Sequence, residues 1–445
     1  MRRLRRFGLA AALAAGIVFQ ARAVLAAEPW LFVSDIHFDP AARGSVPASY
    51  GFDTNLALLD SALAEMRRVD PDPPVIVIAG DFLAHHFHYV EADATMKALA
   101  ARFDRAFPRA QFVIALGNED SGCGNYQLSA RAPFLRTVAA AWQPLVNRRA
   151  AAPAFARTFA QDGFYTATLP LAHLHAVVID DVFWSPRYRA ACGGTSAARR
   201  TIDDLRTALR AWPHDPKWVI AHIPPGVDAF STIQLARQLV VVPFLEPAPR
   251  DELLRLIDDP RARVTAMLAS HTHKFAYRID AADGSPAVPI VLVPSISPIF
   301  HNAPSFLTVD VLPDGTLGAA DDHTYLKGRW SVIGGSRTLG LARISGTTLL
   351  DLQARLSRDA GLRRRYARLY DGGARPEIDE RHWRAYWCTS TAFSTDAYVA
   401  CIGRTRGYSV VTRRGLIVFG AAIVTLALAG ALLVRRYRRT ARRDR

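Results

Sequence analysis

The sequence predicts an α/β fold assembled around parallel strands. Several short apolar runs contain almost no polar residue, which is typical of strands buried on both faces of a sheet. Between these runs lie longer segments whose apolar residues recur at helical spacing. Strands that alternate with helices along a chain indicate an α/β architecture.

The elements follow one another in a regular order. The expected strands are 30–33, 75–79, 112–116, 218–220 and 264–269. The expected helices are 55–69, 92–107, 127–146, 197–212 and 250–257. From residue 306 to residue 344 the pattern changes to short strands separated by turns. Two helical stretches, 348–370 and 381–387, are expected after it.

Both ends of the chain carry membrane-related signals. Residues 1–27 combine four early arginines, a short apolar stretch and small residues, which predicts a secretory signal peptide. Residues 415–434 hold no charged side chain and are long enough to cross a bilayer as one helix. Seven arginines follow in 435–445, and positive charge stays on the cytoplasmic side. The sequence therefore predicts a membrane-anchored protein whose body lies outside the cytoplasm, in the periplasm if it is bacterial.

This topology accounts for the charge of the chain. The formal net charge is +15, of which the signal region contributes five arginines and the segment from Arg413 onward contributes +8. The remaining body carries only +2, so no nucleic-acid partner is expected. That body exceeds one typical core, and we expect a large domain at 28–345, a smaller helical region at 346–403 and a linker at 404–414.

The four cysteines are expected to form disulfides. An even number of cysteines outside the cytoplasm favours disulfide bonds over free thiols. Three pairings are open. Cys388 with Cys401 would close a local loop, and Cys123 with Cys192 would join two loops of the large domain.

Metal-ligand residues follow the predicted strands. Seven such residues stand at or just beyond strand ends: Asp35, His37, Asp81, Asn118, His222, His271 and His273. Ligands gather in the crevice beyond the carboxyl ends of parallel strands. Imidazole and carboxylate groups suit Zn, Fe or Mn, and seven ligands are too many for one ion. Asp81, central in the order, could bridge two ions that together clamp a phosphate ester.

The order of these motifs resembles that of a known family. D-x-H, G-D, G-N, A-H and H-x-H, spread over about residues 30–306, are similar to the calcineurin-like metallophosphoesterases. The resemblance implies a sandwich of two sheets flanked by helices in four layers, and two divalent ions, with zinc favoured and Mn or Fe as alternatives. It implies that Asp35, His37, Asp81 and His273 hold the first ion. It implies that Asp81, Asn118, His222 and His271 hold the second, with a bridging hydroxide attacking phosphorus.

Four longer sequence runs indicate which branch of this superfamily the chain resembles. The runs at 80–85, 117–120, 221–226 and 271–275 look like those of acid sphingomyelinase-like phosphodiesterases. This resemblance implies a phosphodiester substrate that could be lipid-linked, and a helical C-terminal region, which we expect to serve packing only. Phosphomonoesterase, nucleotidase and polyphosphatase activities are alternatives, as is a non-catalytic envelope scaffold on the same fold.

One position departs from the superfamily pattern. Most members have G-N-H-[DE], whereas this chain has Glu119 in the place of that histidine. A glutamic acid could act as a proton donor only with a raised pKa. The resemblance makes His85 the better candidate, because in this branch that position lies over the substrate phosphate. His86 and His88 read as loop residues, and His301 fits either the mouth of the site or a plain loop.

Overall fold

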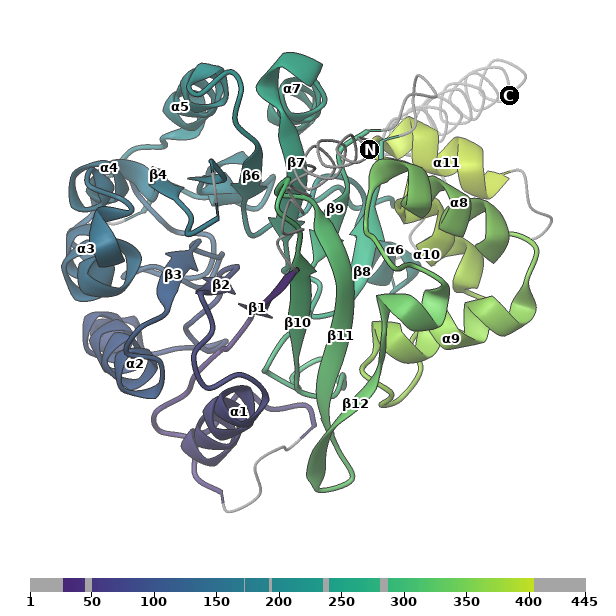
Figure 1. Ribbon diagram of the computed structural model, residues 1–445, viewed down its shortest axis with the longest axis horizontal. Coiled ribbons are helices and arrows are strands. Elements are labelled where there is room, and N and C mark those ends of the chain that lie inside the picture. Colours follow the sequence, from purple (N-terminus) through teal and green to yellow (C-terminus); the bar gives the residue numbers. More distant parts are fainter. Residues whose placement is uncertain are drawn as a thin grey trace, which may run out of the picture.

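The fold is built on two sheets of six strands each. The computed structural model describes residues 27–44, 50–171, 173–191, 194–234, 240–280 and 287–403. The two sheets pack against each other, and helices cover the outside of the sandwich (Figure 1). This arrangement agrees with the predicted α/β class and with the two-sheet sandwich that the family resemblance implied.

The first sheet joins the N-terminal strands to a later antiparallel ribbon. Its strand order is β12-β11-β10-β1-β2-β3. The bounds are β1 Glu28–Val33, β2 Val75–Ile78, β3 Gln111–Ile114, β10 Ser305–Val311, β11 Leu317–Leu326 and β12 Arg329–Gly335. β1, β2 and β3 are parallel, whereas β10 pairs antiparallel with β1. The carboxyl ends of the three parallel strands therefore open on one edge.

The second sheet has the order β4-β5-β6-β7-β9-β8. Its bounds are β4 Tyr165–Thr168, β5 His175–Val178, β6 Lys217–Ile220, β7 Val264–Ala269, β8 Ala276–Arg278 and β9 Ile290–Leu292. β5, β6, β7 and β9 run parallel, and β4 and β8 are antiparallel edges. All five predicted strands are confirmed, with ends shifted by at most two residues.

The helices match most of the predicted ones. Outside the sandwich lie α1 Leu56–Val69, α2 Ala92–Ala106, α3 Pro133–Val146, α4 Phe155–Asp162, α5 Ala198–Arg210, α6 Ala229–Gln234 and α7 Pro247–Ile257. The predicted helix at 127–146 begins only at Pro133, because proline is favoured in the first turn of a helix and has no N–H to donate. α4 and α6 had no expected counterpart.

Large aromatic side chains fill the space between the two sheets. The Trp30 ring of β1 meets the Trp218 ring of β6 edge to face, with ring centroids 5.2 Å apart. Phe32 packs against the same indole at 5.8 Å. All three side chains are fully buried. Burying an aromatic side chain stabilises a fold by roughly 1.5–3 kcal/mol, so this contact fixes how the two sheets face each other.

The C-terminal region is helical, as predicted, but more finely divided. It contains α8 Gly346–Leu356, α9 Ala360–Tyr370, α10 Trp383–Thr389 and α11 Thr395–Gly403, which lie together beside β8 and β12 (Figure 1). The single stretch expected at 348–370 is wrong in one respect: it is two helices. Asp359 ends the first by acting as the N-cap of the second, its side chain accepting from the amide of Leu362.

One of the expected disulfides joins two cysteines that both lie within the described residues. Cys388 of α10 is bonded to Cys401 of α11. Cys123 is also disulfide-bonded, and Cys192, with which a pairing was expected, lies outside the described residues.

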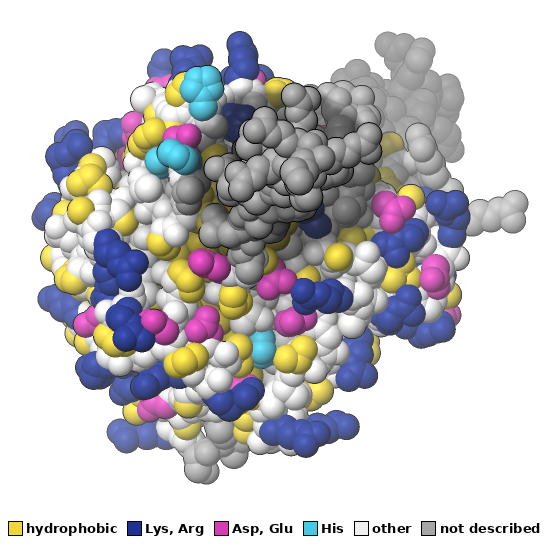
Figure 2. Space-filling model, in the orientation of Figure 1, with side chains coloured by type: hydrophobic (Ala, Val, Ile, Leu, Met, Phe, Trp, Pro, Cys, Tyr) yellow, Lys and Arg dark blue, Asp and Glu magenta, His cyan; other side chains and the backbone are white. Residues whose placement is uncertain are grey.

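The membrane signals fall largely outside the described residues. The predicted signal peptide, apart from its last residue, and the whole of the linker, membrane helix and tail at 404–445 are not described. Among the residues that are described, no helix is both long and apolar enough to cross a membrane. On the face shown in Figure 2, basic and acidic side chains of the described residues are interspersed.

Candidate metal centre

The strand ends of both sheets meet at a single place. Asp35 and His37 follow β1, Asp81 follows β2, and Asn118 follows β3. From the second sheet, His222 follows β6, and His271 and His273 follow β7. Because the parallel strands of both sheets end at this edge, the loops bring all these side chains together.

Asp81 lies at the middle of the group. Its Oδ2 atom is 3.4 Å from Nε2 of His37 and 3.1 Å from Nε2 of His222. Asp35 Oδ1 is 3.4 Å from Nε2 of His273. Among the described residues, three groups of ligand atoms are compact enough to hold an ion. One is His37 with His85 and His273. The other two, Asp35 with His37 and Asp81, and Asp81 with His222 and His271, share Asp81, as expected of a bridging carboxylate.

Hydrogen bonds to the backbone aim the two central imidazoles. Nδ1 of His37 donates to the carbonyl of Leu83 at 2.9 Å, and Nδ1 of His222 donates to the carbonyl of Ala79 at 2.8 Å. With Nδ1 engaged in this way, Nε2 of each ring is the nitrogen left for a metal. Such outer contacts fix the tautomer and orientation of ligating histidines.

Two of the predicted ligands each have a buried oxygen that accepts no hydrogen bond from the described residues. Oδ2 of Asp35 accepts from the Ser270 hydroxyl, and Oδ1 of Asp35 is left without a hydrogen bond. Nδ2 of Asn118 donates to Asn125 at 3.1 Å, and Oδ1 of Asn118 is likewise unpaired. A buried acceptor without a partner costs about 1–3 kcal/mol. A cation would satisfy both atoms, so the residues present fit a metal centre.

The electrostatics of the pocket favour positive charge. Burial opposes protonation of His37 and His222, but the Asp81 carboxylate outweighs it and raises the pKa of each ring to about 10. Burial lowers the pKa of His271 and His273, and the neighbouring protonated rings add to that effect. A metal ion would replace the protons on the first pair as the source of positive charge.

The backbone at this edge is strained. Five of the seven predicted ligands have a left-handed backbone: Asp35 (φ 43°), His37 (43°), Asp81 (53°), His271 (65°) and His273 (62°). This conformation is uncommon outside glycine and costs on the order of 1 kcal/mol or more per residue. Strain of this kind gathers at functional sites, where the rest of the fold holds it in place.

Steric crowding explains why the residue before Asp81 is a glycine. Gly80 has φ of 98°, and a Cβ atom there would lie 2.6 Å from Nδ1 of His222. A side chain at this position would therefore push His222 away from Asp81.

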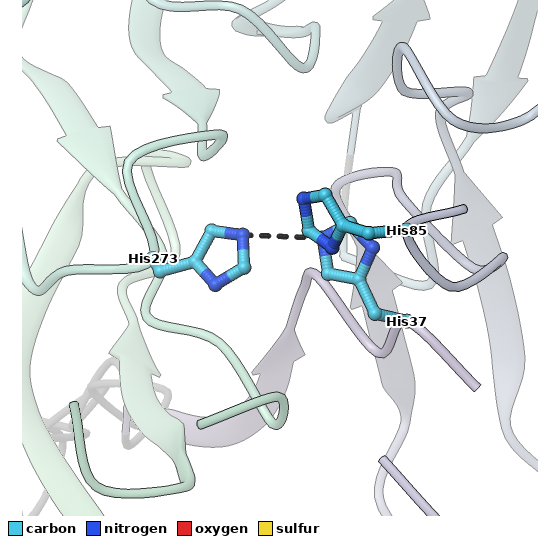
Figure 3. A group of neighbouring side chains, drawn as sticks. All are labelled: His37, His85 and His273. Carbon is cyan, nitrogen blue, oxygen red and sulfur yellow. Dashed lines mark hydrogen bonds between the residues drawn. The ribbon is translucent and has the colours of Figure 1, made fainter. Parts of the chain in front are cut away.

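His85 and Glu119 occupy different surroundings. A ring nitrogen of His85 lies within 4.8 Å of ligand atoms of His37 and His273, and the three imidazoles face one another (Figure 3). Glu119 is 1% exposed, and its Oε2 accepts from the hydroxyl of Tyr89 at 2.7 Å. Burial, and then the charge of Asp81, raises the pKa of Glu119.

A cavity of about 330 Å³ opens beside the ligands. Its lining from the large domain includes Asp81, His85, Asn118, His271 and His273, whereas Glu119 is not part of it. The opposite wall comes from the C-terminal helical region: Tyr366, Tyr370, Glu377, Tyr386, Thr389 and Ser390. The expectation that this region serves packing only is therefore incomplete, because its side chains face the same space as the metal-ligand residues.

Supporting residues were harder to foresee. Asp181 accepts from the backbone amides of His222 and Ile223 and so holds the loop after β6. Asp53 binds His85, although in sequence it stands just before the N-cap of α1 and signals only a helix start. His301 lines a neighbouring cavity rather than this one.

Comparison with known proteins gives a consistent picture. The profile of the calcineurin-like phosphoesterase family matches residues 29–275. Sphingomyelinase phosphodiesterase D of Dictyostelium discoideum is 23% identical over 275 residues, covering 58% of this chain and 57% of that protein. Acid sphingomyelinase-like phosphodiesterase 3b of Mus musculus is 23% identical over 295 residues, covering 60% of this chain and 61% of that protein.

The chain thus spans about three fifths of the length of these curated relatives. Among solved structures, a dimetal phosphatase from Danio rerio superposes with a TM-score of 0.45 at 13% identity, over 69% of this chain and 99% of that one.

Proposed function

This chain belongs to the calcineurin-like phosphoesterase family, and from that membership we propose that it hydrolyses a phosphodiester with the help of two divalent metal ions. The observation that carries the proposal is the pair of ligand sets that share Asp81. The oxygens of Asp35 and Asn118 that accept no hydrogen bond support it, because a cation would satisfy both.

Each ion would be held by four side chains, and Asp81 would be shared between the two ions. Asp35, His37, Asp81 and His273 would hold the first, and Asp81, Asn118, His222 and His271 the second. Ions held in this way neutralise the phosphoryl oxygens and turn water into a nucleophile at neutral pH. Zinc suits this mixture of imidazole and carboxylate donors, and manganese and iron are the alternatives.

His85 hands a proton to the departing alkoxide. It lines the cavity, and its ring stacks on that of His37 with centroids 4.2 Å apart. Glu119 does not line the cavity, and its Oε2 accepts from the Tyr89 hydroxyl. His85→Ala should keep its metals and lose roughly 10²–10⁴-fold in turnover on alkyl esters, the range of general-acid catalysis.

The substrate is a phosphodiester whose organic group occupies the cavity next to the metals. The support is the similarity to sphingomyelinase-like phosphodiesterases and the aromatic wall of Tyr366, Tyr370 and Tyr386. A lipid-linked diester fits both. A phosphomonoester or nucleotide is the alternative, since the metal core is the same.

A substrate panel tests this function. The full chain in detergent is assayed on an aryl phosphodiester, an aryl phosphomonoester, a nucleotide, polyphosphate and a phospholipid, each with Zn²⁺, Mn²⁺ or Fe²⁺. Preference for diesters over monoesters, lost on chelation and restored by one of the ions, is the expected result. Two bound metals without hydrolysis of any ester would favour a non-catalytic scaffold instead.

The active domain is placed outside the cytoplasm and anchored by residues 415–434. Support comes from the sequence pattern and from the Cys388–Cys401 disulfide, a bond typical of oxidising compartments. A reporter fused after Arg445 should be active in the cytoplasm. A reporter active only outside it would contradict this topology.

A further inference from the structure

A carboxylate from the loop before α1 holds His85 at two points. Oδ2 of Asp53 accepts from the backbone N–H of His85 at 2.7 Å. Oδ1 of Asp53 accepts from Nδ1 of the His85 ring at 3.1 Å. Asp53 and His85 are 32 residues apart in the chain, so this contact is made by the tertiary fold.

Asp53 is itself fixed in place. Its Oδ1 also accepts from the Ser297 hydroxyl at 3.0 Å, and its side chain is only 9% exposed. Burial alone would raise the pKa of this carboxyl, but the hydrogen bonds from His85 outweigh burial and lower it. Asp53 is therefore a carboxylate in the folded protein, able to accept all three bonds.

The His85 ring is confined on its other sides. It stacks on His37 with an interplanar angle of 28°, and the edge of the Phe300 ring lies 5.6 Å away by centroids. Because Asp53 occupies Nδ1, the nitrogen left free is Nε2. One imidazole nitrogen thus faces a carboxylate, and the other is available to the cavity that His85 lines.

We propose that Asp53 is a positioning residue for the reaction: it keeps the proton of His85 on Nδ1 and presents Nε2 to the leaving group. In the reaction the P–O bond to the leaving group breaks, and a proton delivered through Nε2 of His85 forms the new O–H bond of the alcohol, while Nδ1–H stays donated to Asp53. This inference rests on the proposed role of His85 as proton donor.

A purely structural role for Asp53 is the competing explanation. The bond from the His85 backbone amide and the bond from Ser297 could simply anchor two loops. In that case the loss of Asp53 would lower stability and harm all substrates alike. A role through His85 would instead depend on how much the leaving group needs a proton.

A double-mutant cycle separates the two explanations. Asp53→Asn, His85→Ala and the double variant are assayed on a nitrophenyl diester and on an alkyl diester. Asp53→Asn should lower kcat by roughly 10–10³-fold on the alkyl ester, within the general-acid range, and far less on the nitrophenyl ester, with KM and metal content unchanged. In the His85→Ala background it should cost nothing further.

Ser297→Ala is the matched control. It removes the third bond to Asp53 and leaves both bonds from His85, so it should change activity little on either ester. Equal losses on the two esters, full additivity with His85→Ala, or the same loss in Ser297→Ala would overturn the inference.

A spectroscopic readout does not depend on turnover or on folding of a weakened variant. In the metal-free chain with ¹⁵N-labelled histidine, His85 should show a protonated, hydrogen-bonded Nδ1. A neutral His85 with its proton on Nε2 would also overturn the inference. If His85→Ala loses the same activity on the alkyl and nitrophenyl esters, His85 is not the proton donor and Asp53 cannot position it. If His85→Ala loses more on the alkyl ester but Asp53→Asn does not, His85 is the proton donor and Asp53 is not needed to position it.

Discussion

The two walls of the cavity differ in how their buried polar and charged groups are satisfied. The wall at the strand ends leaves buried oxygens of Asp35 and Asn118 without partners and holds five residues in a left-handed backbone. At the helical wall, Asp371 and Glu377 meet the buried ammonium of Lys274, which comes from the loop after β7, at 2.9 Å and 3.0 Å. The first wall has buried acceptors that cations would satisfy, whereas the two carboxylates of the second already share a cation supplied by the chain. Under the proposed function, the first wall would carry the chemistry and the second would select the organic group of the substrate.

The largest expected effect comes from breaking the strand-end wall at its centre. Asp81→Asn removes the charge shared by both ligand sets, so both ions should be weakened or lost and hydrolysis should fall to background. Elemental analysis should show about two metals per native chain and clearly fewer in the variant. Asp322→Asn is the control, because that carboxylate is equally buried but lies in β11, away from the ligands. A fully active Asp81→Asn protein with one tightly held metal would rule out the two-metal centre.

A large effect on stability, rather than chemistry, is expected where Lys274 joins the loop after β7 to the helical wall. Lys274→Met leaves the buried Asp371 and the half-buried Glu377 without their cation, which should destabilise the fold by roughly 3–5 kcal/mol in denaturant unfolding. Arg337→Met, which breaks an exposed ion pair with Asp310, should cost at most about 1 kcal/mol.

The Lys274 effect should depend on pH in a defined direction. Burial, opposed by Lys274, already raises the pKa of Asp371, and without the ammonium it should rise further. A carboxyl whose folded pKa exceeds its unfolded pKa destabilises the fold at high pH and ceases to do so once pH falls below both values. The deficit of Lys274→Met should therefore shrink on acidification. A deficit that grows on acidification would show that the two carboxylates do not depend on Lys274.

The smallest expected effect, that of Tyr386→Phe, tests most directly whether the helical wall acts on substrate binding and not on chemistry. Tyr386→Phe removes the hydroxyl that donates to Glu377 and keeps the ring in the cavity wall. One net hydrogen bond is worth about 0.5–1.5 kcal/mol; if its loss shifts Glu377 in the cavity wall by a comparable energy, KM for a bulky diester should change by roughly two- to tenfold. Turnover of a small aryl ester and metal content should stay the same. Tyr325→Phe, on β11 outside the cavity lining, should have no effect. A drop in kcat for every ester would place Tyr386 with the chemistry after all.

Sequence reasoning reached the strand-end wall because its information is local. Each motif stands directly behind an apolar run, and parallel strands bring their ends together whatever the helices do. The helical wall could not be foreseen in the same way. Lys274 and Asp371 are 97 residues apart, and no periodicity reports such a contact.

Asp53 and Glu119 also show that the sequence does not predict which side chains meet in the folded chain. Asp53 has no motif, and only the folded chain places it against His85. Glu119 was visible as a departure from a pattern, yet its bond to Tyr89 follows from the short helix at Tyr89–Glu91, which the apolar spacing did not indicate. Division of the predicted helix at 348–370 was likewise set by a single capping side chain, Asp359.

The left-handed backbone of the ligand loops has a consequence for protein engineering. At Asp35, His37, Asp81, His271 and His273, glycine or asparagine would adopt the observed dihedral angles with less strain than the native residues. A metal-free variant carrying such replacements would be expected to melt at a higher temperature than the metal-free native chain. That result would indicate that the native residues at these five positions lower the stability of the metal-free chain in favour of metal binding, and that a thermostable scaffold can be obtained from this fold by replacing them.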